Sequence, residues 1–307
     1  MKKLLICVFL FAVLLTLPAC QKQETKSENI YFISQADYEK KTYVMHYSGG
    51  DVIENVYELH SDIACIDGSK LYYALDKTIH IVELTDSSSE EYAVLPDDII
   101  ALAGDSNGVY AMCRPLYGNH RYVIYKVTPE ESTRIDENGV IPLHYPMTTG
   151  DGYLFYRGQN PDALMAYNAT EGKTTQIYSG GAGQLTYDSG FIYHAVLHRT
   201  AKVNIETGEA SFVQRGISAP HEGFLYYAHQ LFCEETASHL YEIFRRKDDD
   251  IELCGKVQLP SMGFHELSDL ITFGEYGFIT QGVKHFDPTE YTYFPYGSTE
   301  GITLTVK

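Results

Sequence analysis

The chain repeats one short pattern seven times, and this repetition constrains its fold more than any other feature. Each copy is a pair or triplet of apolar and aromatic residues, usually placed after Gly, Asn or Asp. The copies are Ile30-Tyr31-Phe32, Leu71-Tyr72-Tyr73, Val109-Tyr110-Ala111, Leu154-Phe155-Tyr156, Phe191-Ile192-Tyr193, Leu225-Tyr226-Tyr227 and Phe278-Ile279-Thr280. Their last residues are 34 to 53 residues apart, about 41 on average, a period typical of repeated β-sheet units.

A second strand, a tight polar turn and a third strand are predicted after each copy. The second strands are expected at Thr42–Tyr47, Thr78–Leu84, Tyr122–Val127, Ala163–Asn168, Ala201–Ile205, Leu240–Phe244 and Tyr291–Pro295. The turns contain Gly, Asp and Asn, which supply the positive φ angles and side-chain hydrogen bonds of hairpins. Third strands follow, as at Val52–Leu59, Thr174–Tyr178 and Ile302–Val306.

Six of the seven copies are also preceded by a short, weakly apolar segment. These segments are Ile63–Ile66, Ile99–Ala103, Tyr145–Thr149, Gln184–Tyr187, Ile217–Ala219 and Leu270–Phe273. Short segments of this kind are expected to form the innermost strands, which are crowded around a central channel. After the first twenty residues, no long stretch has the apolar periodicity of a helix. We therefore predict an all-β fold, a β-propeller of seven four-stranded blades whose first blade lacks its innermost strand or receives it irregularly. Six blades, a β-sandwich or a pair of smaller β domains are the alternatives.

One copy of the repeat carries a family resemblance. The segment Leu71–Asp76 (LYYALD) resembles the repeat of low-density-lipoprotein-receptor-type propellers, in which an aromatic pair precedes a polar residue and Asp. Most other copies lack this Asp, so the resemblance implies the architecture and no functional motif. The chain has no Trp, unlike quinone-cofactor, WD-type and sialidase-type propellers. From Ile30 onward it is similar to bacterial propeller lipoproteins, most of which have no assigned role.

The first twenty residues have the pattern of a secretory signal peptide. Lys2 and Lys3 precede an apolar run, Leu4–Leu15, which is shorter than the roughly 20 residues that span a bilayer. The following Leu17-Pro18-Ala19-Cys20 resembles the lipobox of bacterial lipoproteins. This resemblance implies that residues 1–19 are removed and that Cys20 carries the lipid. An ordinary secreted protein with a chance cysteine at this position is the alternative.

Residues 20–29 are predicted to link the lipid to a propeller domain at 30–307. Gln21–Asn29 contains no apolar residue and is expected to be a flexible tether. Removal of residues 1–19 lowers the basic residues from 23 to 21 against 41 acidic ones, a net charge of about −20. This charge disfavours nucleic acid and flat adsorption on anionic lipid. We expect a monomer held on the extracytoplasmic face of the cell membrane by its lipid anchor only.

Motifs for common catalytic and metal sites are absent from the sequence. Phosphate-binding loops, the serine hydrolase elbow, the zinc protease helix and the EF-hand loop have no match. We predict no cofactor, no metal and no catalytic residue, and favour a non-enzymatic role. His194 and His198 have metal-like spacing only on a helix, and a strand followed by a loop would separate them. Asp248-Asp249-Asp250 is expected to be a solvated hairpin tip.

Four further cysteines of the mature chain are Cys65, Cys113, Cys233 and Cys254. Their spacing contains no Cys-x-x-Cys pair, so neither a zinc ribbon nor a redox pair is indicated. Export permits a disulfide between Cys233 and Cys254, which belong to one repeat. Isolated buried thiols are the alternative.

The candidate binding residues lie where the second and third strands of the blades are connected, because these connections converge on one face of a propeller. They are predicted at Cys113–Arg121, Arg157–Asp162, Ala195–Thr200, Ala228–His239 and Gln281–Thr289. The candidate ligand-binding residues there are Arg114, His120, Arg157, His198, Arg199, His229 and His285. Arginine binds planar anions through its forked guanidinium, although such cations can also merely offset neighbouring Asp and Glu.

These features predict a binding or scaffold module for a protein, a peptide or an anionic envelope ligand. One alternative is an envelope-polysaccharide hydrolase or lyase with its site at the channel mouth, because propellers host many activities. Another is a sensory or assembly accessory of a membrane complex.

Overall fold

The computed structural model describes residues 27–34, 42–115, 122–139, 147–158, 163–180, 183–196, 199–215, 218–231, 240–259, 267–282 and 290–307. Within these ranges the chain forms 27 strands and one four-residue helix, α2 (Leu267–Leu270). Long antiparallel runs of strands therefore make up the described body, as the sequence pattern predicted.

Five sheets have four antiparallel strands each, in chain order. The first two are β4 (Ala64–Asp67), β5 (Lys70–Leu75), β6 (Thr78–Glu83) and β7 (Ser88–Val94), then β8 (Asp98–Asp105), β9 (Gly108–Arg114), β10 (Tyr122–Val127) and β11 (Ser132–Gly139). The next two are β12 (Met147–Gly150), β13 (Tyr153–Arg157), β14 (Ala163–Asn168) and β15 (Lys173–Ser179), then β16 (Leu185–Asp188), β17 (Phe191–Val196), β18 (Arg199–Asn204) and β19 (Ala210–Arg215). The fifth contains β20 (Ser218–His221), β21 (Phe224–Gln230), β22 (Leu240–Lys247) and β23 (Asp250–Gln258).

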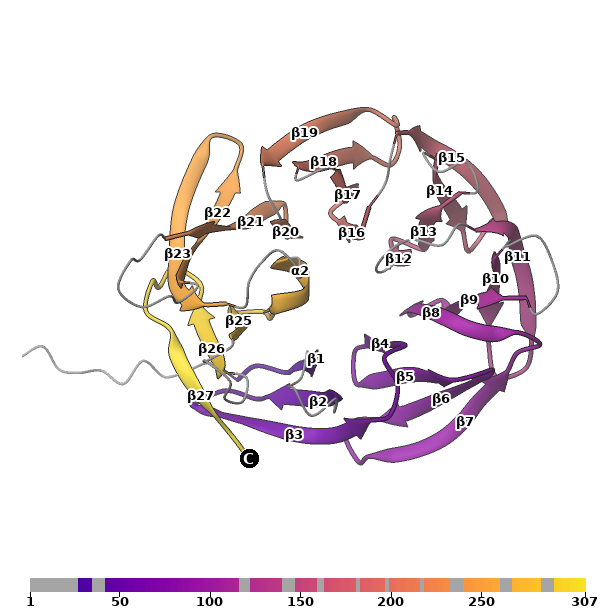
Figure 1. The fold of residues 1–307 in the computed structure, drawn as a ribbon, viewed down its shortest axis with the longest axis horizontal. Helices are drawn as coiled ribbons and strands as arrows, with labels where there is room; N and C mark the ends of the chain where they lie inside the picture. Colours follow the sequence, from indigo (N-terminus) through magenta and orange to yellow (C-terminus); the bar gives the residue numbers. More distant parts are fainter. Residues whose placement is uncertain are drawn as a thin grey trace, which may run out of the picture.

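The sixth sheet joins the two ends of the described chain. Its strands are β1 (Ile30–Ser34), β2 (Thr42–Tyr47) and β3 (Val52–Leu59), then β24 (Ile271–Phe273), β25 (Gly277–Gly282), β26 (Glu290–Pro295) and β27 (Ile302–Val306). The order β1-β2-β3-β27-β26-β25-β24 shows a three-stranded unit beside a four-stranded one. Six four-stranded blades and this three-stranded unit are arranged radially in a ring (Figure 1). The fold is a β-propeller, and within the described residues its first unit has no innermost strand.

Six of the predicted aromatic copies lie in the second strand from the centre of a four-stranded blade, and the copy Ile30–Phe32 lies in β1, the innermost described strand of the three-stranded unit. Their alternation places residues on both surfaces of each sheet, and both surfaces are covered by neighbouring blades. Leu154, Phe155 and Tyr156 of β13, for example, are all fully buried. This explains why the copies are continuous apolar runs rather than alternating ones. The short hairpins before them use residue–glycine pairs such as Ser189-Gly190, in which both φ angles are positive, as type I′ turns require.

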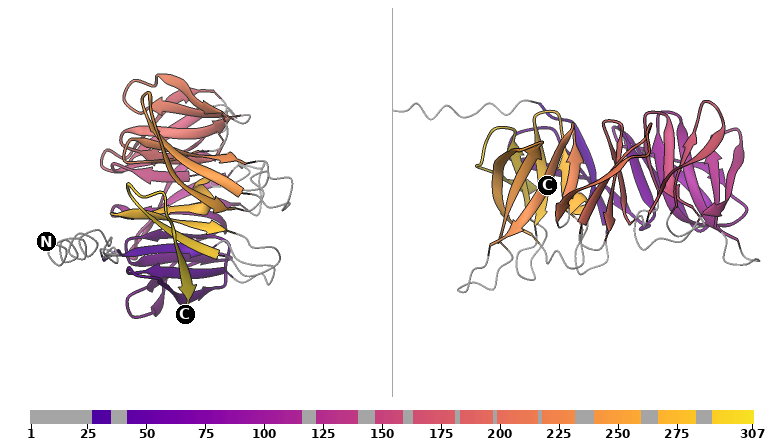
Figure 2. Two further views of the ribbon diagram at one scale, coloured as in Figure 1. Left: turned by 90° about the vertical axis from the view of Figure 1, so that its left-hand side faces the viewer. Right: turned by 90° about the horizontal axis from the view of Figure 1, so that it is seen from above.

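The ring has two different faces, because the strands of every blade run between them (Figure 2). We call one the turn face: it holds the short hairpins between the first and second strands and between the third and fourth. The other is the loop face, which holds the connections between the second and third strands and the passages between blades. Ile30 at the start of β1 pairs with Tyr47 beside the β2–β3 hairpin. The chain therefore enters the body on the turn face.

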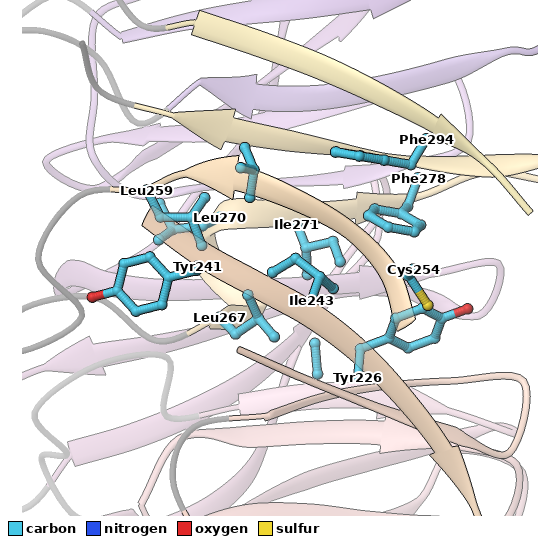
Figure 3. Packing of buried hydrophobic residues seen from close by; sticks show 12 residues of the cluster. Tyr226, Tyr241, Ile243, Cys254, Leu259, Leu267, Leu270, Ile271, Phe278 and Phe294 are labelled. Atoms are coloured by element: carbon cyan, nitrogen blue, oxygen red, sulfur yellow. The ribbon is translucent and has the colours of Figure 1, made fainter. Parts of the chain in front are cut away.

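Neighbouring blades meet in seams filled by apolar and aromatic side chains. In the seam between blades β20–β23 and β24–β27, Tyr226 and Ile243 belong to one buried cluster with Phe278 (Figure 3). The helix α2 contributes Leu267 and Leu270 to the same cluster. Burial of this kind stabilises by about 25 cal/mol per Å² of apolar surface, so the seams are the main source of rigidity.

The ring closes between β3 and β27, the outer strands of the first and last units. Thr305 and Val306 pair in parallel with Val52 and Ile53. Backbone N–H groups of Thr305 and Lys307 donate to Asp51 and Ile53, and Asn55 N–H donates to Lys307. Nearer the centre, the hydroxyls of Ser34 and Tyr291 are hydrogen-bonded at 2.5 Å.

Glu28 links the same two units where the chain enters the body. Its carboxylate is buried (4% exposed) and accepts hydrogen bonds from the backbone N–H groups of Glu275 and Tyr276 and from the Tyr293 hydroxyl. Its own N–H donates to Ser48. Burial and the bond to Glu28 raise the pKa of Tyr293. The body therefore begins at Glu28, within the segment that the sequence assigned to the linker.

Candidate functional site

The sequence-predicted cations that the structure describes lie at the loop-face ends of their strands. Arg114 is the last residue of β9 and is exposed, and Arg157 is the last residue of β13 and is half-buried. Arg199 begins β18, and the exposed His229 lies near the end of β21. The structure thus places these four positions on one face, in four different blades.

The other predicted site residues lie outside the described residues. They are Cys20, His120, His198 and His285. The side chain of Arg199 is not described either. Their roles stay predictions.

One of the predicted connections is shorter than the sequence suggested. β17 ends at Val196 and β18 begins at Arg199, so only residues 197–198 join them, where Ala195–Thr200 was expected. The two strands pair as far as Val196 and Arg199. The blade β16–β19 therefore presents strand ends, rather than a long loop, at this point of the loop face.

His194, which the sequence raised only as a possible metal ligand, is the most unusual polar residue of this region. It lies in β17 and is 2% exposed. Neither of its ring nitrogens has a hydrogen-bond partner among the described residues. Its ring centroid lies 5.7 Å from that of Tyr178 in β15. Burial first, and then the charge of Arg157, lower the pKa of His194 to about 4, so the imidazole is neutral.

Arg157 and His194 face each other across the seam between blades β12–β15 and β16–β19. Phe155, two residues before Arg157 on β13, and Ile192, two residues before His194 on β17, belong to the cluster that fills this seam. Residues two apart on a strand point to the same side. The polar pair thus continues the apolar filling of the seam toward the loop face.

The next seam, between blades β16–β19 and β20–β23, contains a second buried polar pair. The hydroxyls of Thr200 and Ser218 lie 2.5 Å apart and are hydrogen-bonded, and both residues are buried. This pair is satisfied internally, unlike His194. Burying polar groups costs little when they bond to each other.

At the turn face, acidic side chains connect one hairpin to the next. The Asp188 carboxylate accepts the N–H groups of Glu222 and Gly223 at 2.7 and 2.8 Å. The Tyr187 hydroxyl donates to the Asp151 carboxylate in the preceding blade. These carboxylates accept hydrogen bonds from a neighbouring blade, so they hold the blades together.

An aromatic group with a cation lies at the turn-face end of the seam between β20–β23 and β24–β27. The rings of His221 and Phe273 stack at 4.3 Å, and the Arg245 guanidinium lies 4.7 Å from the Phe224 ring centre. Arg245 also forms an ion pair with Glu252 at 2.7 Å. The guanidinium is therefore engaged within its own blade.

The described cysteines are free thiols. Burial raises the pKa of Cys65 and Cys113 to about 12 and that of Cys254 to about 11. They are protonated at neutral pH, and a protonated thiol is a poor nucleophile. Cys254 is a buried single thiol, and Cys233 lies outside the described residues.

No group of three or more His, Cys, Asp or Glu side chains among the described residues is placed to hold a metal ion. Asp248 and Asp250 flank an exposed hairpin tip, where Asp248 has a φ of 54°. In the parts of the chain that the structure describes, no helix is long and apolar enough to cross a membrane.

Comparison with known proteins adds a likeness of fold. No protein-family model matches the chain, and no curated protein matches its sequence. A chain in a complex of S. cerevisiae Dbp5 bound to Nup159, Gle1, IP6 and ADP aligns over 66% of this chain and 59% of its own length, with a TM-score of 0.40 and 10% identity. A chain of a nidogen–laminin complex aligns over 72% of this chain and 89% of its own, with a TM-score of 0.46 and 12% identity. Identities this low transfer no ligand or partner to this chain.

Proposed function

We propose that the protein is a lipid-anchored, extracytoplasmic binding or scaffold module that docks a protein, a peptide or an anionic envelope ligand on its loop face. The observation that carries this proposal is the opposition of the two faces. The chain enters the body at Glu28 on the turn face, and the candidate cations Arg114, Arg157 and His229 lie on the other. A tether at one face leaves the opposite face free for a partner.

The length of the tether supports the same orientation. Between Cys20 and the buried Glu28 there are few residues. Fully extended, a segment of this length reaches about 28 Å at roughly 3.5 Å per residue. A lipid on Cys20 would therefore hold the turn face near the membrane and direct the loop face away from it.

Attachment is tested by replacing the proposed lipidated residue, Cys20→Ala. The wild-type protein should partition into the membrane fraction, and the variant should appear in the soluble extracytoplasmic fraction. A single acyl chain binds only marginally and two give stable attachment, so the expected change is nearly complete. Equal membrane association of both proteins would contradict the anchor.

Docking is tested by purification from membranes with the lipid intact, followed by identification of bound partners. The triple variant Arg114→Ala, Arg157→Ala, Arg199→Ala removes three loop-face cations and should lower the partner yield about tenfold or more. The matched control Lys70→Ala, Lys173→Ala, Lys247→Ala removes three exposed cations at turn-face hairpins. Equal yields from the two triple variants would contradict docking on the loop face.

A further inference from the structure

His194 poses a physical problem that the fold alone does not solve. A buried imidazole with no hydrogen bond loses its hydration without compensation, which destabilises the folded state. Native proteins keep few such groups, and each one calls for a specific explanation. His194 lies in a rigid strand, between β16 and β18, with no described partner for either nitrogen.

A positively charged side chain lies beside His194. Arg157 lies close enough for its positive charge to lower the pKa of the imidazole. The cross-strand partners of His194 are the apolar Leu185 and Ala201, and the ring of Tyr178 covers it from β15. The seam thus holds a cation beside an unused donor and acceptor, in a chain that is strongly acidic overall.

We infer that Arg157 and His194 form a binding site for a single carboxylate group at the loop-face end of the seam between blades β12–β15 and β16–β19. The inference deepens the proposed binding role and rests on it. Arg157 is half-buried and therefore partly exposed to solvent, whereas His194 is 2% exposed and lies deeper in the seam. Arg157 would shift toward an arriving ligand and thereby open the covered imidazole to it.

A carboxylate matches these groups better than other ligands do. The guanidinium can donate two parallel hydrogen bonds and a neutral imidazole one, and a carboxylate has lone pairs for all three. One arginine balances one negative charge, whereas a phosphate dianion would need a second cation. A metal cation would be repelled by Arg157 and would require further ligands.

The probe is acetate, added to the whole protein at constant ionic strength and followed by NMR of isotope-labelled histidine. The chain contains 12 histidines, and the His194 resonance is identified by its loss in His194→Gln. We expect a saturable shift of this resonance with acetate and a smaller one with phosphate at equal concentration. Absence of a saturable shift with acetate, or tighter binding of phosphate, would overturn the carboxylate site.

Two variants separate the site from general charge. Arg157→Gln should weaken acetate binding about tenfold or more, as expected for a lost charged hydrogen bond. Arg114→Gln removes an exposed arginine of the same face and should change binding by less than about twofold. Equal effects of the two would overturn the inference. If Arg157→Gln does not fold, Arg157→Lys keeps the charge without the planar fork and should bind acetate with intermediate affinity.

The source of the carboxylate is distinguished with a glutamate derivative blocked at both backbone ends. Displacement of acetate by this compound would assign the site to an acidic side chain of a partner, and binding of acetate alone to a small free carboxylate. Either result supports the site. A negative acetate titration with undiminished recovery of a loop-face partner would remove this inference and leave the proposed function standing.

Discussion

Glu28 and His194 are both buried, ionisable residues placed between neighbouring blades, and they differ in how they are satisfied. Glu28 accepts three hydrogen bonds at the turn face and ties the first unit to the last. His194 has no hydrogen-bond partner in the part of the chain that the structure describes, and it lies toward the loop face. The difference teaches that the turn face is built to keep the ring closed, and that the loop face keeps unused hydrogen-bonding capacity where a ligand can use it.

The largest effect should come from removing the satisfied carboxylate. Glu28→Ala leaves two backbone N–H groups and the Tyr293 hydroxyl without an acceptor, at a cost of about 3–5 kcal/mol in the free energy of unfolding. Glu275→Ala, an exposed acid of the same contact region, should cost less than about 0.5 kcal/mol. Denaturant unfolding measures both. A similar loss in the two variants would mean that Glu28 does not hold the ring.

Acid should destabilise the protein through His194. Its pKa is about 4 in the folded chain and about 6.5 in the unfolded one, so the unfolded state binds more protons between these values. Stability should fall by about 3 kcal/mol as the pH is lowered from about 6.5 to about 4. Burial also lowers the pKa of His46 and of His221, so these two residues should also make the folded protein less stable as the pH falls.

The His194 part is isolated by His194→Phe, which removes the titrating ring beside Arg157 and Tyr178. The variant should lose less stability than the wild type over this pH range, as measured by urea midpoints at several pH values. Identical pH profiles would show that His194 is not buried and neutral in the folded protein.

The hydrogen bonds that close the ring at the outer strands should contribute less to the free energy of unfolding than Glu28 does. Deleting residues 305–307 removes three backbone hydrogen bonds between β27 and β3, at an expected cost of about 2 kcal/mol. Thr305→Ala with Lys307→Ala keeps the backbone bonds and should cost less than about 0.5 kcal/mol. Calorimetry compares the two. A deletion as mild as the double substitution would show that the parallel bridge contributes nothing.

The smallest effect comes from a pair of buried tyrosines. Tyr293→Phe loses a hydrogen bond to Glu28 and should cost about 1.5 kcal/mol. Tyr110 is fully buried, and its hydroxyl has no partner among the described residues, so Tyr110→Phe should be neutral or slightly stabilising. Melting temperatures of the two variants should move in different directions or by clearly different amounts. A larger loss in Tyr110→Phe would reverse the comparison.

Much of the fold was predictable because each repeat can be recognised from short stretches of the sequence. Six of the aromatic copies mark second strands, and Thr42–Tyr47, Tyr122–Val127 and Ala163–Asn168 match β2, β10 and β14 at both ends. The irregular first unit was also predicted, because no short apolar segment precedes Ile30. The sequence predicted seven blades, with six as the alternative because the first repeat is irregular. Among the described residues there are six four-stranded blades and a three-stranded first unit, which is joined to the last blade in a single sheet.

The long-range polar contacts were not predictable. Glu28 lies in a polar run that has the composition of a linker, and its partners are more than 240 residues away. His194 looked relevant only through its spacing to His198, because its burial beside Arg157 depends on how two blades meet. No local pattern encodes such contacts across a seam.

The central claim is that a partner meets the loop face while the turn face stays toward the membrane. Photo-cross-linking residues introduced at Arg114 and His229, and at the exposed turn-face position Glu171, test it directly in intact cells. The account predicts partner adducts from the first two positions and none from the third. Adducts formed mainly from Glu171 would contradict it.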